Sequence, residues 1–230
     1  MSKIMNIQVC ITLDVDWAND NILQYCIELL EKYNVKATLF ATHDSKVLKE
    51  LDSDNYEIGL HPNFNNSNCD FDKPIKDLKD LYPQAVGARS HGLFTSSGIL
   101  SNYRKYGLKY ESNNFLYLHP NLQVTKRFEG FESIPFFWSD DKIIELEQEE
   151  TNTYLDMKGL KVYNFHPIHV FLNTPTEDYY IENKHHYQND KELEKSRFDG
   201  FGVGTYFENI LKEISDKKLN SYLMKDLIDE

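Results

Sequence analysis

The chain has 230 residues, 40% of them hydrophobic, which is enough to bury a sizeable core within one domain. Its 37 acidic and 25 basic residues give a net charge of -12, which disfavours binding to nucleic acids or to anionic lipid surfaces. The sequence has no run of about 18 apolar residues and no recognisable signal peptide. We therefore expect a cytoplasmic protein without a membrane span.

Strand and helix patterns alternate along the first half of the chain. Residues 6–15 alternate as in a strand, and residues 20–33 carry apolar side chains at helical spacing behind an Asp or Asn cap. Further strands are predicted at 36–42, 56–61, 85–90 and 108–111, and further helices at 43–51, 72–81 and 95–106. This alternation predicts parallel strands with right-handed crossovers, in a barrel or a doubly wound sheet. Either fold collects functional residues at the carboxyl ends of its strands.

The second half of the chain is less regular. Strands are predicted at 131–138 and 160–165, helices at 140–150 and 205–215, and a last short element at 219–227. Residues 173–200 are polar and rich in tyrosine. This composition is typical of an inserted loop or lid rather than of a core segment.

Two carboxylates stand at the end of the first predicted strand. Asp14 and Asp16 are two residues apart, so strand geometry turns them to the same face. Adjacent negative charges are costly unless a proton or a cation is shared, which favours a metal ion or an acid/base role. The same string also fits a helix cap or a solvated turn.

A histidine stands at the end of the third predicted strand. His61 is followed by Pro62, which can open a helical turn, and one turn would bring Asn65 beside the imidazole. With Asp16, these residues make three protein ligands, and three ligands with open positions are what a hydrolytic metal site requires. The alternative is a buried histidine followed by an ordinary turn.

Two further candidates follow later strands. Arg89 could fork onto Asp14 and keep it ionised as a base, although an isolated arginine also fits a surface ion pair. His166 follows the strand 160–165, and the pKa of an imidazole suits a general acid that protonates a departing amine. His166 is preferred over His169 because it stands directly at the strand end.

The motifs, in this order, resemble those of the polysaccharide deacetylases, carbohydrate esterase family four. The similar segments are the first motif at 13–16, the second at 57–65, the third at 89–92 and the fifth at 165–167.

The resemblance implies a distorted (β/α)7 barrel formed by residues 1–230 as a single domain. It implies Asp14 as the catalytic base, Asp16 and His61 as metal ligands, Arg89 as the residue contacting the base, and His166 as the acid. The implied cofactor is one divalent metal ion, with Zn²⁺ expected first, and the implied substrate is an acetylated sugar or polysaccharide precursor. The subset of the family that acts in bacterial surface-polysaccharide biosynthesis is the most similar.

The chain departs from the family pattern in three places. Asn65 stands where the second motif usually has a histidine, so the preference for Zn²⁺ over other divalent ions is open. His91 stands where the third motif commonly has proline, and we assign it to substrate binding. The acidic group of the fourth motif is either Glu111 or the segment Trp138–Asp141. We favour the latter and assign Trp138 and Asp140 to substrate binding, with Trp138 as a wall of the pocket and an acidic residue of this segment near His166, where it could hold the tautomer of the imidazole.

The function predicted from these residues is metal-dependent hydrolysis of an N-acetyl or related acyl group on a sugar. One alternative is a sugar-binding pseudoenzyme, suggested by the missing second histidine. Another is an amidohydrolase that cleaves a small non-sugar C–N bond, because related barrels host several such reactions.

Overall fold

A computed structural model of the chain describes residues 7–65, 70–127, 130–146, 150–187 and 189–228. The described residues form a nine-stranded sheet with the order β6-β7-β5-β4-β3-β2-β1-β9-β8. The strands are β1 (Gln8–Asp14), β2 (Ala37–Ala41), β3 (Tyr56–Leu60), β4 (Gly87–Ala88), β5 (Tyr110–Glu111), β6 (Thr125–Lys126), β7 (Glu132–Ser133), β8 (Trp138–Ser139) and β9 (Leu160–Phe165). Neighbouring strands are parallel except for β6 and β7.

Helices connect most of these strands. The α-helices are α1 (Asp20–Tyr33), α2 (Lys46–Glu50), α3 (Lys73–Leu81), α4 (Ser97–Lys105), α5 (Asp141–Leu146), α6 (Pro167–Leu172), α7 (Glu177–Asn183), α8 (Asp190–Lys195) and α9 (Val203–Asp216). The described residues also form the short 3-10 helices η1 (His91–Leu93), η2 (Lys184–His186) and η3 (Met224–Leu227).

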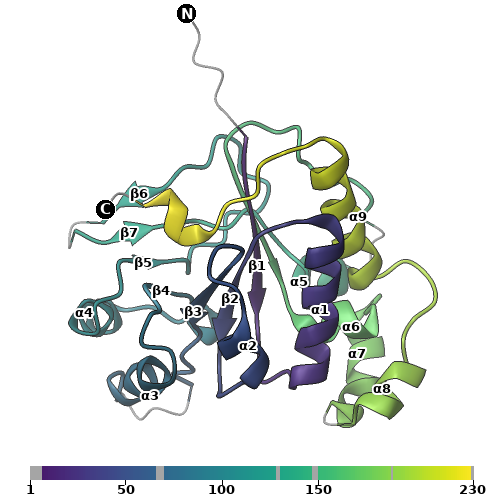
Figure 1. The fold of residues 1–230 in the computed structure, drawn as a ribbon, viewed down its shortest axis with the longest axis horizontal. Coiled ribbons are helices and arrows are strands. Elements are labelled where there is room, and N and C mark those ends of the chain that lie inside the picture. The colour runs from purple at the N-terminus through teal and green to yellow at the C-terminus, as the bar shows by residue number, and fades with distance from the viewer. Residues whose placement is uncertain (1–6, 66–69, 128–129, 147–149, 188, 229–230) are drawn as a thin grey trace, which may run out of the picture.

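The sheet curls into part of a barrel. Strands β1 to β5 lie side by side in chain order, and the chain returns so that β9 pairs with the other edge of β1. Helices α1, α6 and α9 contact one another on the outside of the sheet (Figure 1). The expected α/β barrel class is therefore confirmed.

The first strand and helix form for local reasons. The last six residues of β1 are buried, as expected for a parallel strand covered on both faces. Helix α1 begins after Asn19, whose side chain accepts hydrogen bonds from two main-chain N–H groups of the first turn. It ends at Asn34, which adopts the left-handed conformation with φ 53°. The helix boundaries predicted at 20–33 are confirmed.

Two expectations from the sequence were wrong. The strand predicted at 131–138 is two separate strands, β7 and β8, because Pro135 between them has no N–H for a sheet hydrogen bond. The segment 173–200 is largely helical rather than a loop, since α7 and α8 are capped by Thr176 and Asn189. Leu193 of α8 is fully buried, so this insertion has its own contact with the core.

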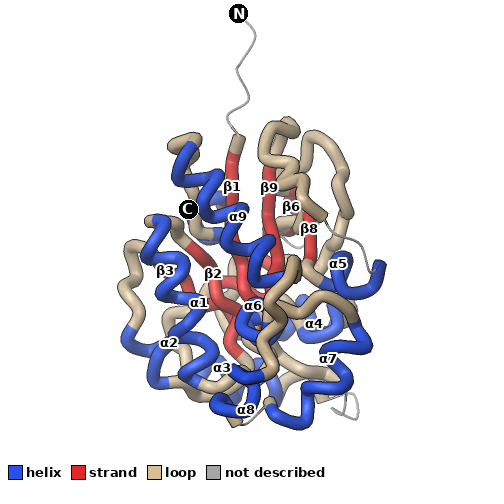
Figure 2. Tube along the Cα trace, turned by 90° about the vertical axis from the view of Figure 1, so that its right-hand side faces the viewer, coloured by secondary structure: helices blue, strands red, loops and turns tan. Residues whose placement is uncertain are grey.

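The insertion lies at the functional end of the barrel. Helices α7 and α8 are placed toward the end to which β1 points (Figure 1), and α8 lies at the same end in the turned view (Figure 2). The helix predicted at 140–150 is confirmed over α5, and residues 147–149 lie outside the described part. Within the described ranges, no helix combines the length and the apolar character needed to cross a bilayer.

Candidate active site

The polar residues of the site stand at the carboxyl ends of neighbouring strands. Asp14 is the last residue of β1, while His61, Arg89 and His166 directly follow β3, β4 and β9. The ends of parallel strands meet at one edge of the sheet. The structure brings these four residues together, as the sequence predicted.

The Asp14 carboxylate is held by two buried partners. Its Oδ1 accepts a hydrogen bond from Arg89 Nη1 at 3.0 Å, and its Oδ2 accepts one from Asn164 Nδ2 at 2.9 Å. The Arg89 guanidinium is fully buried between the rings of Phe40 and Phe136, 4.5 and 4.7 Å from their centroids. Burial alone would raise the pKa of Asp14, but the Arg89 charge opposes it and the pKa is lowered. Asp14 is therefore an oriented, ionised carboxylate.

Asn164 is a site residue that sequence reasoning missed. Its amide nitrogen donates to Asp14, and its Oδ1 accepts from Arg89 Nη1 at 2.6 Å. The available signal was an amide in an otherwise mostly apolar strand, directly before Phe165 and His166. Since period-two geometry turns Asn164 to the interior, it can support Asp14 from the neighbouring strand.

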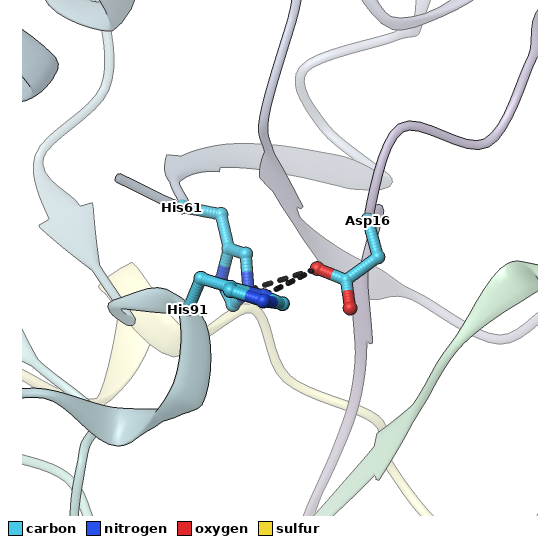
Figure 3. Close-up of side chains that lie close together, drawn as sticks. All are labelled: Asp16, His61 and His91. Carbon is cyan, nitrogen blue, oxygen red and sulfur yellow. Dashed lines mark hydrogen bonds and ion pairs between the residues drawn. The ribbon is translucent and has the colours of Figure 1, made fainter. Parts of the chain in front are cut away.

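A second carboxylate, Asp16, faces two histidines. Asp16 Oδ1 lies 3.2 Å from His61 Nε2 and 3.0 Å from His91 Nδ1 (Figure 3). One ligand atom from each of these three residues lies within 4.8 Å of the others. Asp16 has φ 43°, an uncommon left-handed conformation for a residue other than glycine. Three side chains from separate strand ends thus point toward one small region.

The electrostatics of this cluster fit a divalent cation. Burial would raise the pKa of Asp16, but hydrogen bonds with His61 and His91 lower it well below its usual range. The hydrogen bond to Asp16 raises the pKa of His91. One carboxylate oxygen and two imidazole nitrogens are a donor set that zinc and related ions accept. The buried Nδ1 of His61 has no hydrogen-bond partner, so the protein does not satisfy this ring completely.

The residues that the structure gathers around Asp16 differ from those expected from the sequence. Asn65 is exposed, and its main-chain N–H donates to Asn63 Oδ1 in a local turn. His91, which we had assigned to substrate binding, stands beside Asp16 instead. The reason is geometric: His91 opens η1 directly after β4, whose end adjoins that of β3.

His166 forms a close pair with Asp140. Its Nδ1 lies 2.8 Å from Asp140 Oδ1, and its main-chain N–H donates to Asp140 Oδ2 at 2.6 Å. Burial would lower the pKa of His166, but the Asp140 charge outweighs it and raises the pKa well above the usual range. Burial raises the pKa of Asp140 to about 6, which still leaves it ionised at neutral pH. Nε2 of His166 faces Asp16 Oδ2 at 3.7 Å.

Two residues proposed to contact substrate have other places in the structure. Trp138 is fully buried and stacks on Tyr206 at 4.5 Å, so it belongs to the core and does not wall a pocket. Asp140 is also fully buried and supports His166. The alternative acidic residue, Glu111, is buried and forms an ion pair at 2.9 Å with the partly exposed Arg127.

The insertion reaches the cluster through a tyrosine. The Tyr187 hydroxyl donates a hydrogen bond to the main-chain oxygen of Asp16. Tyr180 of α7 packs edge-on against the His169 ring, with centroids 4.6 Å apart. Burial lowers the pKa of His169 to about 3, so this imidazole is neutral and supports packing. The insertion therefore covers one side of the strand ends.

Comparisons with known proteins agree with this geometry. The WbmS-like polysaccharide deacetylase family matches residues 11–184. A crystal structure of WbmS from Bordetella bronchiseptica, assigned as a polysaccharide deacetylase involved in O-antigen biosynthesis, is 30% identical with a TM-score of 0.84, over 89% of this chain and 90% of that chain. No similar sequence was found among curated proteins.

More distant structures share only the fold. The Bc1960 peptidoglycan N-acetylglucosamine deacetylase is 12% identical with a TM-score of 0.56, over 96% of this chain and 87% of that chain. A protein from Mycobacterium smegmatis assigned as a polysaccharide deacetylase is 16% identical with a TM-score of 0.52, over 94% of this chain and 93% of that chain.

A curled, mostly parallel sheet with carboxylates and histidines at its strand ends defines an α/β barrel whose polar site lies at the carboxyl ends of the strands. The extent of the family match and the similarity to the Bordetella protein identify the family within this fold class. The chain belongs to the WbmS-like polysaccharide deacetylase family.

Proposed function

We propose that this chain hydrolyses the N-acetyl group of a sugar in a surface-polysaccharide precursor, with one divalent metal ion held by Asp16, His61 and His91. The observation that carries the proposal is the convergence of these three side chains beside two separate proton-transfer groups. The family and the role assigned to the Bordetella relative support a polysaccharide precursor as the substrate class.

The metal site and the base are adjacent but distinct. When bound, a divalent ion supplies positive charge that lowers the pKa of a water molecule and stabilises negative charge on the acyl oxygen. Asp14 Oδ1 lies 3.7 Å from His61 Nδ1, and the Arg89 charge keeps the carboxylate ionised. It is therefore placed to accept the proton of the water that attacks the acyl carbon.

The second proton transfer completes the reaction. Cleavage of the amide C–N bond releases acetate and a sugar amine, and the amine nitrogen needs a proton to depart. The Asp140 charge raises the pKa of His166, which favours the protonated imidazole, and Nε2 of His166 faces Asp16 of the proposed metal site. Protonation by Nε2 is therefore the step we assign to His166. The Asp140 contact at Nδ1 fixes the orientation of the ring.

Asp14→Asn tests the assignment of the base. We expect the substitution to lower the rate of acetate release by about 10²- to 10⁴-fold, the usual contribution of a positioned base. Metal content, measured by mass spectrometry, should not change, because Asp14 is not among the three ligands. Asp80→Asn on α3 is the matched control, since Asp80 pairs with exposed Lys76 and should leave the rate unchanged. Activity in Asp14→Asn equal to that of the control would refute the proposal.

A further inference from the structure

A cavity with a volume of about 460 Å³ lies beside the group formed by Asp16, His61 and His91, and His61 is part of its lining. This volume is within the range of about 300–1,000 Å³ that is typical of small-ligand pockets. Its lining comes from the turn after β1, the segments after β2 and β3, and one side of α3, and includes Trp17, Thr42, His61, Asn63, Asp77 and Leu78. Because His61 belongs to both places, a ligand that fills the cavity lies next to the proposed reaction centre.

Trp17 lines this cavity. Its side chain is 41% exposed, and its backbone is left-handed with φ 59°. The main-chain N–H of Trp17 donates to Thr42 Oγ1 at 2.9 Å, and the indole meets the His91 ring edge-on with centroids 5.2 Å apart. Folding does not account for a large exposed ring in a strained backbone conformation, since both features cost free energy. Such an arrangement is typical of a binding site.

The charges of the cavity select against a phosphorylated ligand. Its lining includes the carboxylates Asp70 and Asp77 and one ammonium group, that of Lys73. Lys73 Nζ lies 2.5 Å from Asp77 Oδ2, so its charge is already paired. The remaining carboxylate, Asp70, repels a diphosphate. Carboxylates and the Asn63 amide are, however, good partners for sugar hydroxyl groups.

From this arrangement, and building on the proposed function, we propose that the cavity binds the uncharged sugar unit linked to the acetylated one. The apolar C–H face of that pyranose would lie on the Trp17 indole, with its hydroxyl groups toward Asn63 and Asp77. The substrate is then an N-acetylated glycan of at least two sugars. A nucleotide-activated monosaccharide would place its diphosphate against Asp70.

The test measures binding in an Asp14→Asn background, where turnover is slow. Calorimetric titrations use N-acetylglucosamine, its β-1,4-linked dimer and trimer, and UDP-N-acetylglucosamine as probes. We expect the dimer to bind about 3- to 10-fold more tightly than the monosaccharide, the effect of one aromatic contact. UDP-N-acetylglucosamine should bind no more tightly than the monosaccharide.

Variants locate the effect. Trp17→Ala should remove the advantage of the dimer and leave the affinity for the monosaccharide and the metal content unchanged, while Trp17→Phe should retain part of the advantage. Tyr117→Ala is the matched control, because Tyr117 is 40% exposed and does not line the cavity. Intrinsic fluorescence gives a second readout, since the other of the two tryptophans, Trp138, is fully buried.

Several results would overturn the proposal. They are equal affinities for dimer and monosaccharide, tightest binding of the nucleotide sugar, absence of binding by all four probes, and an unchanged dimer advantage in Trp17→Ala. None of these results bears on acetate release. Failure of the proposed hydrolysis would instead show as no acetate release by the unaltered protein from any N-acetylated probe, so the two failures are distinguishable.

Discussion

Arg89 Nη1 lies 3.0 Å from Asp14 Oδ1 in the interior of the barrel, and both side chains are buried. The pair joins the end of β4 to the end of β1 and lowers the pKa of the proposed base. A lysine at position 89 would keep one positive charge but lose the fork that also binds Ser112 at 2.9 Å.

Arg89→Lys should shift the acidic limb of the pH–rate profile to higher pH. Asp14 acts as a base only when it is deprotonated, and weaker pairing lets burial raise its pKa. The rate of acetate release, measured from pH 4 to 9 in steps of about half a unit, follows this shift. Arg127→Lys alters another arginine–carboxylate pair, that of the partly exposed Arg127 with Glu111, and should leave the limb in place. Superimposable profiles for Arg89→Lys and wild type would contradict the assigned role.

His91→Ala and Asn65→Ala separate the two possible ligand sets. We expect His91→Ala to weaken binding of Zn²⁺ by more than about 100-fold, beyond the effect usual for residues that only support a ligand. Asn65→Ala should have no effect, because Asn65 is exposed. Competition with a fluorescent chelator measures the affinities, and circular dichroism controls for folding. The reverse pattern would restore Asn65 as the third ligand.

Asp140→Asn should shift the alkaline limb of the pH–rate profile to lower pH. The ionised Asp140 raises the pKa of His166, so the acid keeps its proton at neutral pH. Without that charge the pKa falls by about 1–3 units, and activity is lost on the alkaline side at correspondingly lower pH. Asp156→Asn is the matched control, because this exposed carboxylate pairs with Lys217 and is not among the charges that act on His166. An unmoved limb in Asp140→Asn would exclude His166 as the titrating acid.

Gly87→Ala should destabilise the fold. A Cβ atom at Gly87 would lie 1.9 Å from the buried Tyr110 ring, so β4 and β5 would have to move. Overpacking of this kind typically costs about 1–3 kcal/mol of unfolding free energy, measured by urea denaturation. Gly98→Ala in α4 meets no atom closer than 3.5 Å and should be neutral or stabilising. Equal stability of the two variants would contradict this packing.

The site residues at the strand ends could be predicted from the sequence because each stands where a strand pattern stops. Asp14, His61 and His166 directly end or follow hydrophobic strands, and Arg89 follows a small-residue strand. Parallel pairing then places them at one edge without any knowledge of tertiary structure. Helix α1 was equally accessible, because its cap and its apolar spacing are local properties.

The parts that could not be predicted depend on contacts between distant segments. Sequence spacing favoured Asn65 as the neighbour of His61, whereas His91 reaches Asp16 from another strand. The stacking of Trp138 on Tyr206 joins residues that are 68 positions apart in the sequence. The local sequence around either residue does not indicate this contact. Likewise, the polar composition of the insertion concealed the helices that carry Tyr180 and Leu193.

The hydrogen bond from Tyr187 ends on the main-chain oxygen of Asp16, an atom that every amino acid possesses. Any side chain at position 16 that tolerates the same backbone conformation therefore preserves the anchor of the covering segment. Loss of the carboxylate and detachment of the cover are separable events. A Tyr187→Phe exchange would loosen the cover while every metal-binding and proton-transfer group named above stays in place.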